Sequence, residues 1–203
     1  MKPLQAGVIG LCVGERHAAA YLAEPACALR AVCDLDAARL KEVGDRLGVA
    51  ERHIDWRRIT EHPEIDVVSI CSYDDGHAEQ AISAFRHGKH VMVEKPAVLH
   101  RREAEAVLRA KEDSGRLLTS NLILRRSPRF VALREMVQQG RFGEIFYLEG
   151  DYIHEILWKI VTGWRGRLPF YCVTYGGGVQ LIDLMRWLMG QEIVEVSGMG
   201  NKL

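Results

Sequence analysis

The chain has 203 residues, enough for one large domain or for one ordinary domain and part of another. Lys plus Arg and Asp plus Glu both number 27, and this zero net charge gives no indication of a nucleic-acid or membrane partner. The five cysteines lack a C-x-x-C spacing, and the eight histidines form no metal-binding pattern. No segment reads as a signal peptide or a membrane span. We therefore expect a cytoplasmic protein without a metal site.

Up to about residue 120, short apolar runs alternate with stretches of helical periodicity. Expected strands span residues 5–10, 28–33, 65–71, 91–93 and 117–123, and expected helices span residues 15–24, 37–47, 56–59, 78–86 and 101–114. The run over 65–71 is almost continuously apolar, which is typical of a strand covered on both faces. This alternation predicts an α/β fold with a parallel, doubly wound sheet.

The first turn has the order of a dinucleotide-binding unit, in which a strand, a glycine-rich turn and a helix follow one another. The turn reads Gly10-Leu11-Cys12-Val13-Gly14, so Cys12 stands where a full G-x-G-x-x-G motif has glycine, and its side chain narrows the approach to a pyrophosphate. A plain strand–helix connection would look similar. Asp34, however, ends the second strand 24 residues after Gly10, close to the ~20 expected for a carboxylate that binds ribose hydroxyls. This acid favours the nucleotide site.

A second candidate site follows the strand over 91–93, which is succeeded by Glu94, Lys95 and Pro96. In an open parallel sheet, ligands bind at the carboxyl ends of the strands. A lysine there can donate to a substrate oxygen, or its pKa can be lowered by desolvation so that it exchanges a proton. The alternative is a surface Glu-Lys pair that contributes less than ~1 kcal/mol.

The pattern changes from Arg125 onward. The sequence predicts a helix over 128–139, a strand over 144–152, a polar and aromatic loop over 158–175, a helix over 181–189 and a further strand over 193–198. Two strands alone are seldom independently stable. We expect the boundary between two domains near residue 122, with domains spanning 1–122 and 123–203.

Six sequence blocks occur in the same order as in one known family: AGVIGLCVGERH, AVCDLD, IDVVSICSYDDGH, GKHVMVEKP, RFGEIFYLEGDY and GGGVQLIDLMRWLMG. On these blocks the chain resembles the Gfo/Idh/MocA family of nicotinamide-dependent oxidoreductases over essentially its whole length. The resemblance implies an N-terminal Rossmann domain followed by the start of an α+β domain with an open, mainly antiparallel sheet, often used for oligomerisation. Family members run well past 300 residues, so the chain resembles a C-terminally truncated member.

The resemblance also implies catalytic residues. Lys95 would contact the substrate hydroxyl and help to move its proton, and Glu94 would position the cofactor and the lysine. The family commonly carries an H-x-x-D motif after its glycine-rich turn, in which Asp183 matches the aspartate and Gln180 replaces the histidine. Glutamine can hydrogen-bond a hydroxyl, but it cannot take a proton near neutral pH. Lys95 or Asp183 would have to serve as the base instead.

The expected cofactor is NAD rather than NADP, because the Asp34 carboxylate would repel a 2′-phosphate. The residues expected to bind it are Gly10, Cys12, Val13, Gly14, Asp34, Ser72, Tyr73, His77, Glu94, Lys95, Trp164 and Arg165. Three of these have a plainer alternative: His77 can be a structural residue at a helix start, and Trp164 and Arg165 can belong to an exposed loop. Arg125 and Arg126 are equally compatible with solvated charges and with anion binding.

These observations predict hydride transfer between NAD(H) and a sugar, cyclitol or related polyol, in a protein that forms homo-oligomers through its C-terminal sheet. The alternative is a catalytically weakened NAD-binding module, which acts as a sensor or as one subunit of a larger assembly. Gln180, Cys12 and the short length of the chain point to this alternative. A different Rossmann reductase is a more remote possibility, because it would not carry the whole series of blocks.

Overall fold

The computed structural model describes residues 2–155, 157–169 and 171–200. The chain forms two compact units, Met1–Asn121 and Leu122–Leu203, and each has its own secondary structure. None of the helices among the described residues combines the length and apolarity that a membrane span requires.

The first unit is built on a six-stranded sheet with the order β3-β2-β1-β4-β5-β6. Its strands are β1 (Leu4–Ile9), β2 (Cys27–Cys33), β3 (Glu51–His53), β4 (Val67–Ile70), β5 (His90–Val93) and β6 (Leu118–Ser120). Every neighbouring pair is parallel. The predicted doubly wound sheet is therefore confirmed, and its strand order reverses between β1 and β4, the position at which such sheets bind dinucleotides.

Helices cover both faces of this sheet. They are α1 (Gly14–Ala23), α2 (Ala37–Leu47), α3 (Arg57–Thr60), α4 (His77–Arg86) and α5 (Arg101–Ser114). Successive residues of a strand point to opposite faces, so Val8 packs in the cluster that contains α1 and α2 residues, and Ile9 packs in the cluster that contains α4 and α5 residues. The near-continuous apolar runs of the sequence reflect this double coverage.

The short strand β3 was not predicted from the sequence. Its residues Glu51, Arg52 and His53 are polar, and β3 forms one edge of the sheet by pairing with β2 only. A three-residue polar edge strand has neither apolar alternation nor a buried run, so no periodicity marks it. The helix α3 was expected at 56–59 and is found one residue later, within the usual uncertainty of helix ends.

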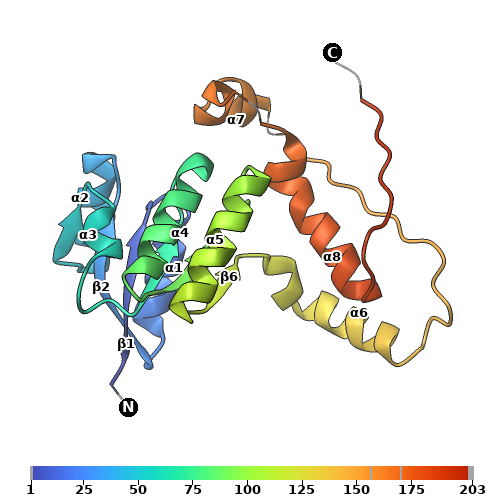
Figure 1. The fold of residues 1–203 in the computed structure, drawn as a ribbon, viewed down its shortest axis with the longest axis horizontal. Coiled ribbons are helices and arrows are strands. Elements are labelled where there is room, and N and C mark those ends of the chain that lie inside the picture. Colours follow the sequence, from blue (N-terminus) through green and yellow to red (C-terminus); the bar gives the residue numbers. More distant parts are fainter. Residues whose placement is uncertain (1, 156, 170, 201–203) are drawn as a thin grey trace. The chain divides into compact units, whose positions relative to one another are not determined.

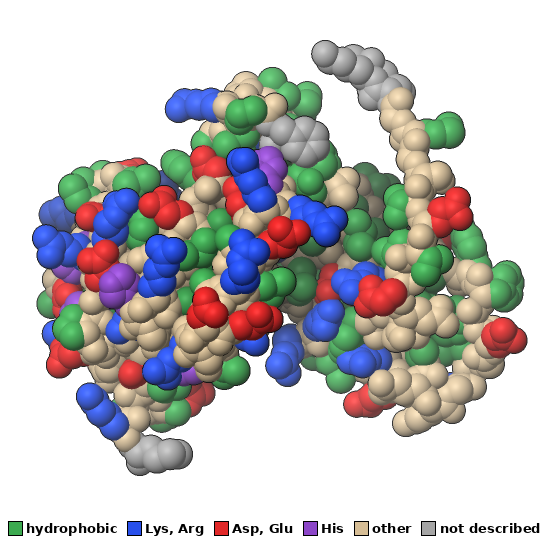
Figure 2. Space-filling view, in the orientation of Figure 1, with side chains coloured by type: hydrophobic (Ala, Val, Ile, Leu, Met, Phe, Trp, Pro, Cys, Tyr) green, Lys and Arg blue, Asp and Glu red, His purple; other side chains and the backbone are tan. Residues whose placement is uncertain are grey.

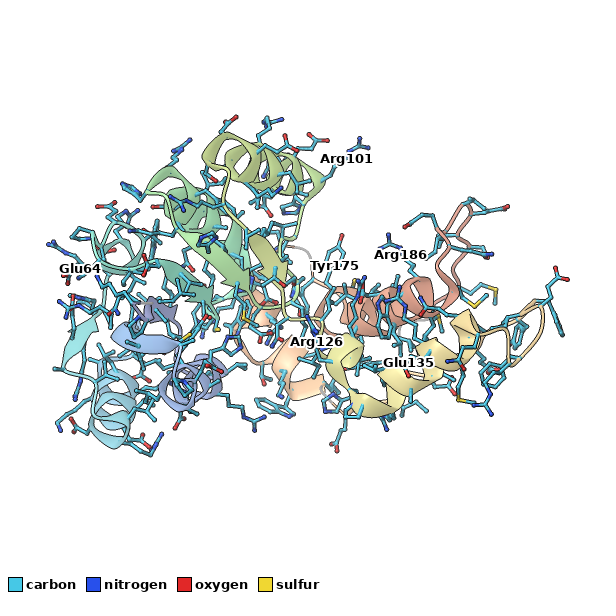
Figure 3. All side chains as sticks on the ribbon, turned by 90° about the horizontal axis from the view of Figure 1, so that it is seen from below. Glu64, Arg101, Arg126, Glu135, Tyr175 and Arg186 are labelled. Atoms are coloured by element: carbon cyan, nitrogen blue, oxygen red, sulfur yellow. The ribbon has the colours of Figure 1, made fainter. Side chains whose placement is uncertain are left out.

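The second unit contains α6 (Pro128–Gln138), α7 (Leu157–Val161) and α8 (Val179–Met189). The helices α6 and α8 pack against each other, and the guanidinium of Arg134 on α6 lies 4.4 Å from the ring centre of Trp187 on α8. Figure 3 shows Glu135 on α6, and Tyr175 and Arg186 before and within α8. Arg186 binds Glu192, just beyond the end of α8, with distances of 2.9 and 2.6 Å.

Three predictions for the second unit are wrong in detail. Residues 144–152 and 193–198 were expected to be strands, but they have irregular backbone (Figure 1). A strand requires a hydrogen-bonding neighbour, and neither segment pairs with another one among the described residues. The expected loop over 158–175, of which residue 170 lies outside the described residues, contains most of α7 and a 3₁₀ turn over Trp164–Arg167. Such short helical turns leave no periodic signal in the sequence.

The surface of the first unit carries both signs of charge. Figure 2 shows acidic and basic side chains interspersed on the face in view, in line with the equal numbers of acidic and basic residues in the chain. Several of these charges form pairs along helices, such as Lys41 with Asp45 and Arg101 with Glu105. Exposed pairs of this kind contribute little to stability.

Candidate functional site

The turn between β1 and α1 brings backbone very close to neighbouring backbone. Gly10 has a φ of +84°, and a Cβ at this position would lie only 2.6 Å from the Cys71 carbonyl carbon and 2.7 Å from the Ser72 nitrogen. Gly14 begins α1 and is buried, and its Cβ would lie 2.9 Å from Cγ1 of Val8. Both positions therefore require glycine for close packing of the turn, the helix and the strand.

The N-terminus of α1 is suited to an anion. The helix has no side-chain cap, because Val13 occupies the capping position. The first backbone N–H groups of a helix lack partners within the helix, and the helix dipole adds positive potential at this end. Phosphate groups commonly bind in this position. Cys12 in the same turn is exposed, so its side chain faces the space outside the turn and not the core.

Asp34 closes the other side of this turn. Its Oδ2 accepts a 2.7 Å hydrogen bond from the Leu11 backbone N–H, and its Oδ1 accepts a 2.8 Å bond from the Asp36 N–H. A carboxylate has about four acceptor positions, so both oxygens can still accept from hydroxyl groups. The glycine turn and the acid after β2, which the sequence predicts to form one nucleotide site, are thus joined by the hydrogen bond from Leu11, the residue after Gly10.

Glu94 and Lys95 follow β5 at the carboxyl end of the sheet. The Glu94 carboxylate is buried and accepts from three donors: Asn121 Nδ2 at 2.6 Å, His17 Nε2 at 3.1 Å and the Lys95 backbone N–H at 3.2 Å. Burial by itself raises the pKa of this carboxyl, but the hydrogen bonds from His17 and Asn121 outweigh it and leave the pKa below its usual value. Glu94 is therefore ionised at neutral pH.

Two of these partners were missed in the sequence. His17 lies on α1, where a histidine reads as an ordinary helix residue, and Asn121 follows β6 without a motif. The remaining ring nitrogen of His17 lies 3.3 Å from Oγ of Ser69, which in turn lies 2.9 Å from the Tyr21 hydroxyl. Ser69 is fully buried within the apolar run of β4. The sequence signal that could have revealed these contacts is Ser69, a hydroxyl side chain within the apolar run of a predicted strand.

The loop after β4 holds three predicted cofactor residues. His77 is fully buried at the start of α4, and its ring nitrogens lie 2.8 Å from the Pro96 carbonyl oxygen and 3.2 Å from the Ser72 carbonyl oxygen. Ser72 donates its hydroxyl hydrogen to Gln80 at 2.7 Å, whereas Tyr73 is about half exposed. His77 thus joins the loops after β4 and β5, a structural contact, while cofactor contacts of these residues stay predictions.

In the second unit, Asp183 is a buried carboxylate held by one arginine. It is buried on α8, and Arg125 binds it in a bidentate manner, from Nε to Oδ2 at 2.7 Å and from Nη2 to Oδ1 at 2.5 Å. The hydrogen bond to Asp183 raises the pKa of Arg125. Gln180, one turn earlier on α8, has a buried Oε1 without a hydrogen-bond partner among the described residues.

Trp164 and Arg165 lie in the 3₁₀ turn of the second unit. The Arg165 guanidinium stacks 4.2 Å from the centre of the Trp164 ring, and its Nε donates to the Tyr171 hydroxyl at 2.9 Å. These contacts show an internally packed turn, and a role in cofactor binding stays a prediction. Among the described residues, no group of three or more His, Cys, Asp or Glu side chains is arranged to hold a metal ion.

A parallel sheet of this order, with a tight glycine turn before α1 and an acid after β2, defines a dinucleotide-binding domain. The model of the "Oxidoreductase family, NAD-binding Rossmann fold" matches residues 4–122, and that of the "GFO/IDH/MocA C-terminal domain" matches residues 130–203. The chain therefore belongs to the Gfo/Idh/MocA oxidoreductase family, as its sequence blocks predicted, and the cofactor class of its Rossmann domain is NAD.

Several relatives share this organisation. The chain is 28% identical to the myo-inositol 2-dehydrogenase of Thermotoga maritima, with 98% of the chain and 59% of that protein covered. It is 31% identical to inositol 2-dehydrogenase 2 of Saccharopolyspora erythraea, with 81% and 47% covered. The crystal structure of the Lactobacillus plantarum myo-inositol 2-dehydrogenase has a TM-score of 0.87 at 27% identity, with 94% of the chain and 57% of that chain covered. The chain thus spans about half the length of the curated relatives that it matches.

Proposed function

We propose that this chain provides the cofactor site and part of the substrate site of an NAD-dependent dehydrogenase that oxidises a cyclitol or related polyol. The observation that carries the proposal is the pair Glu94–Lys95, which follows β5 beside the switch point of an NAD-binding sheet. The inositol dehydrogenases among the relatives support the substrate class. We further propose residues 1–122 as the cofactor domain and 123–203 as part of the substrate domain.

The fold and the residues present fit the cofactor. The backbone of Gly10, Cys12, Val13 and Gly14 would line the pyrophosphate at the N-terminus of α1, and Asp34 would accept hydrogen bonds from the adenosine ribose. When bound, NAD supplies the carbon that accepts the hydride. The protein's own task is then to hold the substrate carbon in place and to remove the proton of its hydroxyl group.

Lys95 is the stronger candidate for the group that takes up that proton. Asp183, the other group considered, has both carboxylate oxygens bound by the Arg125 guanidinium, and an ion pair of this geometry favours the charged carboxylate over the protonated one. Gln180 cannot take a proton. We assign Lys95 the proton transfer, and Asp183 and Gln180 hydrogen bonds that hold the substrate.

The test is turnover of NAD with myo-inositol and scyllo-inositol by the wild type and by Lys95→Ala. The variant should lower kcat by about 10²–10⁴-fold, the usual contribution of a general acid–base group. Lys95→Arg should not restore the rate, because a guanidinium does not give up its proton. Unchanged turnover in Lys95→Ala would contradict the assignment.

A second candidate function is an NAD-binding module with weakened catalysis. Gln180, which stands at the histidine position of the H-x-x-D motif that the resemblance implies, favours this alternative, and its buried Oε1 has no hydrogen-bond partner among the described residues. Tight NAD binding without NADH production, both in the wild type and in Gln180→His, would support the module. A gain of turnover in Gln180→His would instead support the dehydrogenase.

We also propose self-association through the segments at 144–152 and 193–198. Phe146 and Val194 in these segments are 97% and 98% exposed, which is unusual for apolar side chains near unpaired backbone. Light scattering coupled to size-exclusion chromatography should show a dimer or larger species. A monomer at all concentrations would contradict this proposal.

A further inference from the structure

We propose that His17 is a positioning residue that holds Glu94, and through it the backbone of Lys95, so that the nicotinamide half of the cofactor site keeps its shape. The inference rests on the proposed function, because it assigns Lys95 to the reacting end of the cofactor. The contacts that carry it, however, lie entirely within the first unit and can be tested separately.

The side chains of Tyr21, Ser69, His17 and Glu94 form a continuous series of hydrogen bonds that ends beyond β5. The His17 side chain is 9% exposed and that of Glu94 is 11% exposed, so their 3.1 Å hydrogen bond is nearly free of competing water. The other ring nitrogen of His17 lies 3.3 Å from the Ser69 hydroxyl, and Tyr21 lies 2.9 Å from that hydroxyl. Tyr21 follows His17 by four residues and therefore lies on the same face of α1.

The charge of Glu94 sets the direction of its hydrogen bond with His17. Its lowered pKa leaves it ionised, and an ionised carboxylate can only accept, so Nε2 of His17 carries the hydrogen. The proposal places the acceptor at Nδ1, so that Ser69 donates to it. The Ser69 oxygen is in turn free to accept the Tyr21 O–H. Every link then has one donor and one acceptor, so the single hydroxyl within the otherwise apolar β4 has partners on both sides.

The position of this series of hydrogen bonds in the sheet indicates its function. In a doubly wound sheet the two halves of a dinucleotide bind on either side of the switch point, here between β1 and β4. Asp34 follows β2 on the adenosine side, and Glu94 follows β5 on the other side. His17 stands one turn into α1, whose N-terminus would meet the pyrophosphate. It therefore links the phosphate-binding helix to the strand that carries Lys95.

Loss of His17 should therefore weaken the binding of the nicotinamide half of the cofactor only. Glu94 would keep Asn121 and the Lys95 N–H as donors but lose its third, and the carboxylate could turn away from the position that fixes Lys95. The adenosine side, held by Asp34 and the glycine turn, shares none of these contacts. A residue that merely stabilised the fold would weaken both halves alike.

The experiment compares calorimetric binding of NADH with that of ADP, which occupies only the adenosine side. His17→Ala should weaken NADH binding by about tenfold or more, the effect of one charge-assisted hydrogen bond, and ADP binding by less than about twofold. His17→Gln, whose amide can donate to Glu94, should recover most of the loss. His87→Ala, which removes an exposed histidine of the same unit, is the matched control and should change neither Kd. Equal weakening of NADH and ADP binding in His17→Ala, or no weakening at all, would overturn the proposal.

A second measurement keeps the proposal testable where a variant folds poorly. Long-range ¹⁵N–¹H NMR of the wild type reports which nitrogen of His17 carries the hydrogen, and the proposal requires Nε2–H. Ser69→Ala, which removes the donor to Nδ1, should reduce that preference. A dominant Nδ1–H form in the wild type would overturn the proposal. A wild type that binds neither NADH nor ADP but shows Nε2–H would refute the proposed function and leave the His17–Glu94 bond intact.

Discussion

Replacing Gly10 by alanine should be among the most damaging small changes in the first unit. Gly10 has a φ of +84°, and an added Cβ would overlap the backbone of Cys71 and Ser72, neither of which can move without displacing β4. The left-handed conformation costs an alanine about 1–2 kcal/mol, and forcing extra volume into packed structure costs about 1–3 kcal/mol more. We therefore expect the free energy of unfolding to fall by about 2–5 kcal/mol.

Gly48→Ala provides the matched control. Gly48 also has a positive φ, +67°, but nothing lies within 4 Å of the position that its Cβ would take. It should therefore lose only the conformational part, about 1–2 kcal/mol. Urea unfolding followed by circular dichroism measures both changes, and calorimetry with NAD measures the effect on the turn. Gly10→Ala should also abolish NAD binding, whereas Gly48→Ala should not. Equal destabilisation by the two substitutions would refute the reasoning.

Three further predictions follow from individual groups. Because the pKa of Glu94 is lowered on folding, its contribution to stability is complete above the ordinary glutamate pKa of about 4.3 and is lost as the pH falls below it. Urea unfolding of the wild type and of Glu94→Gln should therefore differ at pH 7 and converge as the pH falls through the lowered pKa of folded Glu94, and a constant difference would contradict this. Arg125→Met should lower the free energy of unfolding of the second unit by about 1–3 kcal/mol, because a buried carboxylate loses both donors, whereas Arg101→Met, which removes an exposed pair of the first unit, should change the free energy of unfolding of that unit by less than about 0.5 kcal/mol. Equal effects would argue against that ion pair. Iodoacetamide should label the exposed Cys12, and bound NAD should protect it, whereas Cys33, whose pKa burial raises to about 12, should stay unlabelled until the protein unfolds. Peptide mass spectrometry that found equal labelling of both would contradict this.

The first unit was largely predictable because its signals are local and repeated. Each buried strand is a short apolar run, and helices with clear ends separate them, such as α2, which Asp36 caps at one end and Gly48 ends in a left-handed conformation. The proximity of Gly10 and Asp34 could also be predicted, because both residues follow the ends of strands that a parallel sheet places along one edge.

The second unit was less predictable for a physical reason. Alternating apolar residues at 144–152 and 193–198 indicate a preference for strand, but hydrogen bonds to a neighbouring strand decide whether one forms. The hydrogen bonds between Arg125 and Asp183 could not be predicted either, because the two residues lie 58 positions apart in the sequence. An arginine before a helix has no spacing that distinguishes a solvated charge from the partner of a buried carboxylate.

The site shows the same contrast. The glycine turn, Asp34 and the Glu94–Lys95 pair belong to motifs, whereas His17, Ser69 and Asn121 come from three separate elements that meet only in the folded sheet. The motifs therefore predict residues that would face ligands, whereas the residues that hold Glu94 in place carry no motif.

The most direct test of the account is calorimetric titration of this chain with NAD and then with NADP. The account predicts micromolar binding of NAD and at least about tenfold weaker binding of NADP, because the Asp34 carboxylate would face the added 2′-phosphate. Asp34→Ser should remove most of that preference. Equal or tighter binding of NADP would contradict the role of Asp34, and absence of binding by both would contradict the cofactor site itself.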